Sequence, residues 1–196
     1  MNKYLYKFTN ISVRHRLTNI SVRHRLDLFD KLISHILNYA SQVVGFIQGY
    51  SIERVHLQFC KRLLGVERTT QNGFVYGELG RHTFQMFRYI TLVLYWIKIL
   101  HTDDNKYIRK VYNMLKHDMQ VYPDTPNWCT ILKDLLCTLG MYDAWYFQEI
   151  GNTDYILYIV KQRLCDQFVQ NWQGRLQQSN RARCYKIISS FKLQPY

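Results

Sequence analysis

Glycine and proline are scarce in this chain of 196 residues, which contains nine glycines and three prolines. So few turn-forming residues argue against a fold of many short strands and favour a small number of long helices. Charged residues are also few, at 20%, whereas apolar residues make up 47% and aromatic residues 15%. This composition excludes a disordered tail and predicts a protein with a packed core.

The sequence also lacks a long apolar segment. Its most apolar run, residues 89–97, is closed by Arg88 and Lys98 and is far shorter than the ~20 residues that cross a bilayer. The first residues do not form the continuous apolar stretch of a secretory signal. Five cysteines, an odd number at irregular spacing, are typical of free thiols in a reducing compartment. We therefore expect an intracellular protein of the cytoplasm or nucleus, neither secreted nor attached to a membrane.

Acidic residues are missing from both ends of the chain. Residues 1–26 contain six basic residues and no acid, and residues 171–196 contain five basic residues and no acid. The whole chain carries a formal net charge of +12, although residues 27–170 are almost neutral. Concentrated positive charge without acids suits a polyanion, of which nucleic acid is the commonest. The alternative is a pair of basic termini that face solvent and bind nothing.

Part of the N-terminal charge comes from a tandem repeat. The nonapeptide TNISVRHRL occupies residues 9–17 and recurs unchanged at 18–26. Nine residues make about 2.5 helical turns, so two helical copies would face opposite sides. The copy is also too short to be the unit of a solenoid. The duplication therefore adds charge without forming one continuous basic stripe.

Apolar residues recur at helical spacing along most of the chain. Gly65 is a candidate C-terminal glycine, and Ser51 and Asn152 or Thr153 are candidate N-caps. The prolines at 123 and 126 should break the chain. Residues 66–81, which contain three glycines, are predicted to form a loop. Helices are predicted over 26–47, 51–65, 83–101, 104–121, 128–139, 142–149 and 154–176.

The expected fold is all-α, a bundle of about six to eight helices with flexible basic termini. We expect three parts along the chain. Residues 1–25 form the basic duplicated segment, residues 26–122 form a helical lobe, and residues 127–196 form a second helical lobe with a basic, aromatic tail.

Two groups of residues invite comparison with catalytic or metal sites. The pair Asp103-Asp104 resembles the aspartates that bind two metal ions in polymerases, but it precedes a predicted helix, where Asp is a natural N-cap. Glu53, His56 and Cys60 can share one helix face, but a structural zinc site needs four ligands, usually from close pairs. We therefore expect a capping role for the aspartates and a core thiol at Cys60, with no metal, no cofactor and no catalytic residue.

The candidate binding residues are basic side chains at the two ends of the chain and a third set near the predicted helix 51–65, most of which lie away from its apolar face. One patch is expected at the predicted helix 51–65 and just beyond it. In the tail, basic residues alternate with Trp172, Tyr185, Phe191 and Tyr196, a pattern that suits single-strand binding; the alternative is that these rings pack inward. Phosphate contacts give affinity without sequence choice. The predicted nucleic-acid-binding residues are Arg14, Arg16, Arg23, Arg25, Arg54, Lys61, Arg62, Arg68, Arg175, Arg181, Arg183 and Lys186.

Three sequence blocks, in the same order, resemble one family. IERVHLQFCKRLLGVERTTQN (52–72), followed by GELGR (77–81), is similar to the region just downstream of the reverse transcriptase domain in invertebrate non-LTR (LINE-type) retrotransposon polyproteins. LDLFDKLISHILNYASQVVGF (26–46) resembles the segment before it, and SNRARCYKIISSFKLQPY (179–196) resembles a later basic, aromatic block. The family usually has an acid and a tryptophan where this chain has Gln42 and Val44.

The resemblance implies a thumb or post-thumb region that helps to grip template and product. The palm, the endonuclease and the zinc-binding segment of the family are expected to be missing, and no catalytic residue of the family maps onto this chain. The predicted function is therefore non-catalytic, sequence-nonspecific binding of RNA or DNA by a retrotransposon-derived fragment. One alternative is a helical protein-interaction module with a helical protein partner. An exposed apolar surface would favour this alternative. The other is a decayed open reading frame without a selected function.

Overall fold

The computed structural model describes residues 20–47 and 49–179, together with Tyr185 and Phe191. Every regular element in this part of the chain is a helix, which confirms the all-α fold predicted from the sequence. The predicted flexible termini lie almost entirely outside the described residues. In chain order the elements are α3 (Val22–Phe29), the π-helical segment η1 (Asp30–Ser34), α4 (His35–Leu37), α5 (Ser41–Val44), α6 (Tyr50–Leu64), α7 (Asn72–Leu79), α8 (Phe84–Leu100), α9 (Tyr107–Val121), α10 (Trp128–Thr138), α11 (Tyr142–Phe147) and α12 (Thr153–Gln178).

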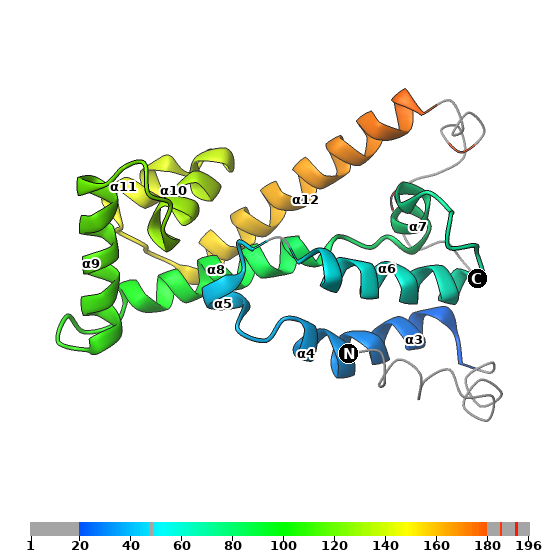
Figure 1. Cartoon of the computed structure of the whole chain (residues 1–196), viewed down its shortest axis with the longest axis horizontal. Coiled ribbons are helices and arrows are strands. Elements are labelled where there is room, and N and C mark those ends of the chain that lie inside the picture. The colour runs from blue at the N-terminus through cyan, green and yellow to red at the C-terminus, as the bar shows by residue number, and fades with distance from the viewer. Residues whose placement is uncertain (1–19, 48, 180–184, 186–190, 192–196) are drawn as a thin grey trace.

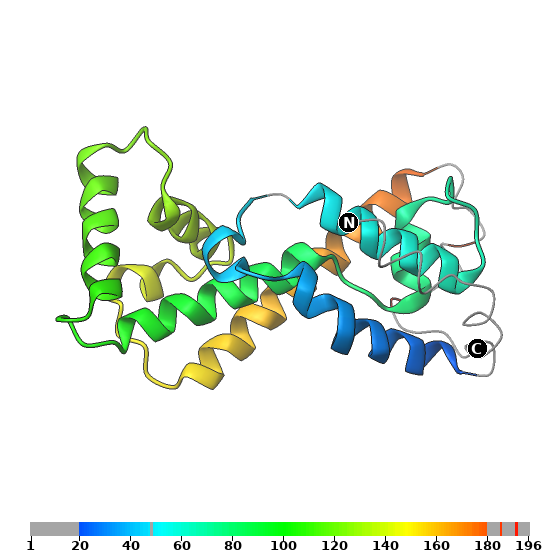
Figure 2. The ribbon, with the colours of Figure 1, turned by 60° about the horizontal axis from the view of Figure 1, so that its bottom comes forward.

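Two long helices, α8 and α12, connect the two ends of an elongated molecule (Figures 1 and 2). One lobe gathers α9, α10 and α11 around the second half of α8 and the start of α12. The other lobe contains α3, η1, α6 and α7 together with the last turns of α12. Within the described part of the chain, no helix combines the length and the apolarity that crossing a bilayer requires.

The larger core fills the lobe of α9, α10 and α11. Trp96, Tyr112 and Leu132 are buried there, at the centre of one continuous cluster. The Trp96 Nε1–H donates to the Tyr112 hydroxyl oxygen at 3.1 Å, and the Gln148 amide donates to the same oxygen at 2.8 Å. The polar atoms of these buried rings are therefore satisfied, as a stable core requires.

This core also crosses the predicted lobe boundary. It joins side chains of α8 and α9, which precede Pro123 and Pro126, to side chains of α10, α11 and α12, which follow them. The two prolines lie in the turn between α9 and α10. The prolines therefore end a helix without ending the core.

A smaller core joins α3, α6 and α7. Leu26, Cys60 and Leu79 are buried in it, and the ring of Phe29 stacks on that of Phe59 with centroids 4.1 Å apart. Aromatic pairs of this kind contribute about 0.5–1.5 kcal/mol beyond the burial of their area. The cluster packs α3 against α6, so one side of α6 is buried in the interior.

Most predicted helix boundaries agree with the structure. Gly65 ends α6 in the left-handed conformation, at φ +68°, as expected of a C-terminal glycine. The side chain of Asn152 caps α12 by accepting from the backbone N–H of Tyr155 at 3.0 Å. Ser51 is not the N-cap of α6, since the helix begins one residue earlier, after Gly49. The predicted helices that are confirmed, with small shifts at their ends, are those at 51–65, 83–101, 104–121, 128–139, 142–149 and 154–176.

The predicted continuous helix over 26–47 is wrong. The helical path from α3 ends after Leu37, and Ala40 adopts the left-handed conformation at φ +57° before α5 begins. This break lets α5 lie on α8, where the Arg88 guanidinium donates to the Val44 carbonyl and the Gln85 amide donates to the Gly45 carbonyl, both at 2.8 Å. These bonds satisfy carbonyl groups at the end of α5 that have no partner inside the helix.

The predicted loop over 66–81 is also wrong in its second half, which forms α7. Gly73 and Gly77 lie one turn apart on the face of α7 that contacts α12. The Trp172 Nε1–H donates to the Gly73 carbonyl at 2.7 Å, and a Cβ atom on Gly77 would lie 2.5 Å from Cζ2 of Trp172. The glycines that suggest a loop therefore permit a close helix–helix contact.

We expect Gly77→Ala to lower the free energy of unfolding by about 1–3 kcal/mol, the usual cost of overpacking, because the new methyl group would collide with the Trp172 ring. The matched control is Gly174→Ala in α12, where a Cβ meets no atom within 4 Å. That change should raise the stability by about 0.5–1 kcal/mol, since alanine is the better helix former. Thermal melts followed by circular dichroism measure both changes, and a Gly77→Ala protein as stable as the control would contradict the close contact.

Candidate nucleic-acid interface

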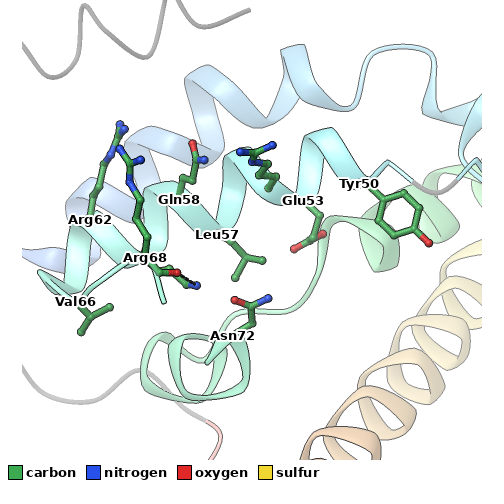
Figure 3. A pocket seen from close by; sticks show the side chains of 10 residues that line it. Tyr50, Glu53, Leu57, Gln58, Arg62, Val66, Arg68 and Asn72 are labelled. Carbon is green, nitrogen blue, oxygen red and sulfur yellow. Dashed lines mark hydrogen bonds between the residues drawn. The ribbon is translucent and has the colours of Figure 1, made fainter. Parts of the chain in front are cut away.

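A groove of about 500 Å³ lies between α6 and the loop that leads into α7 (Figure 3). Its lining residues on α6 recur at spacings of three and four, so they form one face of that helix. Glu53 lies at the edge of this face, and next to it His56 and Cys60 are buried in the interior. The groove is lined by Tyr50, Glu53, Arg54, Leu57, Gln58, Lys61, Arg62, Val66, Arg68 and Asn72.

The groove brings together four of the predicted binding residues, Arg54, Lys61, Arg62 and Arg68. Figure 3 shows Arg62 and Arg68 extending in the same direction at one end of the groove, with Tyr50 at the other end. The Lys61 Nζ donates to the Arg68 carbonyl at 2.8 Å and thereby ties the loop to α6. Partial burial lowers the pKa of Lys61. The four side chains place a concentration of positive charge over one wall of the groove.

The other predicted binding residues do not line this groove. Arg23 and Arg25 lie on α3, where the Arg25 Nε–H donates to the Ile20 carbonyl at 2.9 Å. Arg175 is exposed in the last turns of α12. The remaining predicted residues, Arg14, Arg16, Arg181, Arg183 and Lys186, lie outside the described part of the chain.

The tail aromatics that the structure describes pack inward. Trp172 is buried, the Tyr185 hydroxyl donates to the Phe74 carbonyl at 3.2 Å, and the Phe191 ring lies edge-on to Trp172 with centroids 5.2 Å apart. The packing alternative is therefore confirmed for these three rings, while Tyr196 lies outside the described residues.

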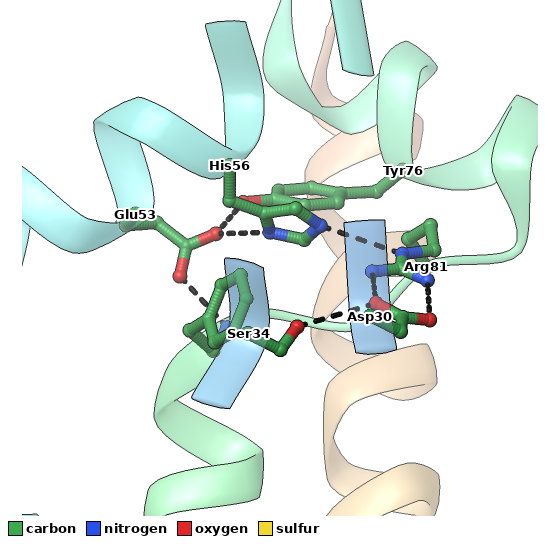
Figure 4. A network of polar contacts seen from close by, with 7 residues as sticks. Asp30, Ser34, Glu53, His56, Tyr76 and Arg81 are labelled. Atoms are coloured by element: carbon green, nitrogen blue, oxygen red, sulfur yellow. Dashed lines mark hydrogen bonds and ion pairs between the residues drawn. The ribbon is translucent and has the colours of Figure 1, made fainter. Parts of the chain in front are cut away.

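A partly buried polar network starts from Glu53, which also lines the groove (Figure 4). One carboxylate oxygen accepts from the Tyr76 hydroxyl and from His56 Nδ1, the latter at 3.3 Å. The other oxygen accepts from the backbone N–H of Phe84 at 2.8 Å. Burial alone would raise the pKa of Glu53, but the hydrogen bonds from His56, Tyr76 and the Phe84 N–H together lower it. Glu53 thus remains ionised, and its acceptors are used inside the protein.

The network continues through Arg81 to Asp30. The Arg81 guanidinium donates two parallel hydrogen bonds to the Asp30 carboxylate, at 2.5 and 2.6 Å, the bidentate geometry that makes such pairs strong. Its Nε–H donates to His56 Nε2 at 3.4 Å. Burial and the charge of Arg81 lower the pKa of His56 despite the neighbouring carboxylates. His56 is therefore neutral at pH 7, with its proton on Nδ1 facing Glu53.

The structure shows what the residues do that resemble a polymerase aspartate pair or a zinc site in the sequence. Asp103 and Asp104 are exposed, and Asp104 accepts from the Arg109 Nε–H at 3.1 Å. The residue at the N-cap of α9 is Lys106, so the predicted capping role of the aspartates is wrong. Cys60 is a core thiol, as predicted: it is fully buried, and burial raises its pKa to about 12. No three candidate metal ligands come together among the described residues.

Comparisons with protein-family models, with curated proteins and with solved structures each return no match. The resemblance to retrotransposon polyproteins therefore stays a prediction from the three sequence blocks.

The sequence does not predict two parts of this site. Tyr50 lies one residue before the predicted start of the helix, although its spacing of four residues from Arg54 was a usable signal. The link from Glu53 to Tyr76 depends on α7, which was predicted as a loop. The link to the Phe84 N–H joins residues 31 apart in the sequence, so no local pattern could indicate it.

We expect the melting temperature to fall as the pH is lowered below 6.5. The folded protein holds the pKa of His56, and that of the partly buried His82, below the ordinary value of 6.5. In the window between the folded pKa and 6.5 the unfolded chain binds more protons, so stability present above 6.5 is lost as the pH falls. Glu53, whose folded pKa is also lowered, adds a further loss below 4.5.

Thermal melts between about pH 7.5 and pH 5 measure this dependence. His56→Gln should give a shallower slope, because one of the two contributing histidines is removed. The matched control is His35→Gln on α4, an exposed histidine that should keep the original slope. An unchanged slope in the His56 variant would show that this ring does not stay neutral in the folded protein.

Proposed function

We propose that this protein binds RNA or DNA without catalysing a reaction on it, and that the groove beside α6 holds the phosphate backbone. The observation that carries the proposal is the convergence of Arg54, Lys61, Arg62 and Arg68 on one groove. Glu53, the carboxylate among the described lining residues, is engaged by Tyr76, His56 and Phe84. The described lining therefore contains four cations and one acid, and the acceptors of that acid are already occupied.

The chemistry of the groove favours binding without sequence choice. Arginine and lysine side chains neutralise phosphates and release condensed counterions, which gives affinity that falls steeply with salt. Such contacts position a nucleic acid but do not read its bases. This behaviour agrees with what the family resemblance implies, a helical region that follows the palm and grips template and product. We propose that the chain is such a retrotransposon-derived fragment.

The triple variant Arg54→Gln, Arg62→Gln, Arg68→Gln should weaken binding to labelled RNA and DNA. Each phosphate contact contributes about 0.7–0.9 to the slope of log affinity against log salt, so the slope should become shallower by about 2 to 3. Fluorescence anisotropy between about 50 and 200 mM salt measures it.

The matched control removes the same charge elsewhere, with Lys98→Gln, Lys110→Gln and Lys161→Gln, all exposed and on α8, α9 and α12. These changes should leave most of the salt slope intact. Equal losses in the two triple variants would mean that total charge, and not the groove, drives binding, and would defeat the proposal.

A second candidate, the helical protein-interaction module, is favoured by a different surface. Leu28, Leu32 and Ile36 follow one another at spacings of four residues along α3, η1 and α4, and all three are exposed, Ile36 at 71%. Tyr39, next on the same path, is 86% exposed. Apolar residues gathered on one side of a helix in this way are typical of interaction surfaces.

If this surface mediates self-association, sedimentation should detect oligomers that persist at high salt, because apolar burial is not screened by ions. Leu32→Glu and Ile36→Glu together should then give a monomer with nucleic-acid binding retained. The control is Met114→Glu on α9, an exposed apolar residue of the other lobe. If the parent protein is monomeric at all salt concentrations, this surface does not mediate self-association.

A further inference from the structure

Tyr50 is the first residue of α6, and its side chain is 77% exposed at one end of the groove (Figure 3). The described aromatic rings of the tail are used in packing against α7 and α12. Tyr50 is thus the aromatic residue among the described residues that line the groove, and its ring is open to solvent. An aromatic face beside a cationic groove is the combination by which proteins stack the bases of single strands.

The spacing along α6 suits a short length of nucleic acid. Arg54 lies one turn after Tyr50, so their Cβ atoms are about 6 Å apart. Arg62 lies twelve residues after Tyr50, about 18 Å along the axis at 1.5 Å per residue. At about 3.4 Å per stacked nucleotide, the wall spans roughly five nucleotides. A base on the Tyr50 ring would therefore have its own phosphate within reach of Arg54 and the following phosphates within reach of Lys61 and Arg62.

The rest of the lining provides groups suited to unpaired bases. Leu57 and Val66 offer apolar surface, and Gln58 and Asn72 offer amide groups. Figure 3 shows Leu57 and Asn72 pointing toward each other across the groove, from α6 and α7. An unpaired base has an apolar face and hydrogen-bonding edges, so this lining can contact both, whereas a duplex presents its phosphates outward and keeps its base faces stacked inside.

We infer that the groove selects single-stranded over double-stranded nucleic acid, with the Tyr50 ring stacked on a base while Arg54, Lys61 and Arg62 hold phosphates along the strand. The inference rests on the proposed function, because it assumes that the groove holds nucleic acid. The cations act on both forms, since both carry phosphates. The ring of Tyr50 acts on the single strand, whose base faces are accessible, and this difference produces the selectivity.

The test compares binding of the full chain to a labelled single-stranded DNA of about 12 nucleotides, the RNA of the same sequence and the matching DNA duplex. Tyr50→Ala should weaken single-strand binding about fivefold or more, the lower end of what the loss of one stacked base costs. Its duplex binding should stay unchanged. Tyr50→Phe and Tyr50→Trp should retain single-strand binding because they retain an aromatic face.

The matched control is Tyr107→Ala, which removes the first residue of α9, 83% exposed and in the other lobe. It should leave single-strand and duplex binding as in the parent chain. Equal loss with Tyr50→Ala on single strand and duplex, or no loss at all, would overturn the inference while salt-dependent binding through the arginines still stood. Absence of salt-dependent binding to any of the three probes would overturn the proposed function and the inference with it.

Discussion

The carboxylate of Glu53 accepts hydrogen bonds from three parts of the chain at once: His56 on α6, Tyr76 on α7 and the first backbone N–H of α8, at Phe84. Arg81 extends the same network to Asp30 on η1. A buried donor or acceptor left without its partner costs about 1–3 kcal/mol, so each member depends on the others. The network fixes which face of α6 points inward. The adjacent face, which Glu53 borders, becomes the wall of the groove.

The network also carries charge that bears on the groove. Asp30 and Glu53 contribute two negative charges, Arg81 contributes one positive charge and His56 is neutral, so one negative charge remains behind the wall that carries Arg54, Lys61, Arg62 and Arg68. Cations held close together repel one another, and a nearby negative charge in a partly buried position offsets some of that repulsion. The same residue, Glu53, thus orders the helices and moderates the charge of the surface that they form.

Local sequence patterns predicted those helices whose apolar spacing and terminal residues are contained within the helix itself. The apolar stretch of α8 and the periodicity of α6, closed by Gly65, gave helices at the right places, and the same periodicity placed Arg54, Lys61 and Arg62 on the solvent side. The missed features depend on distant contacts. Gly73 and Gly77 pack against Trp172, which follows Gly73 by 99 residues, and the partner of Glu53 in α8 is thirty-one residues away.

The hydrogen bond between Trp172 and Gly73 spans 99 residues of sequence, whereas the groove draws on residues 50–72 alone. At a synthesis rate of about 5–20 residues per second, the ribosome needs roughly 5 to 20 s to make the intervening chain. During that interval all the residues of the groove, including the cations of α6, have already been synthesised. The face of α7 that carries Gly73 and Gly77 stays exposed to water until α12 has been made. The order of translation therefore completes the residues of the groove first and closes the interior of this lobe last.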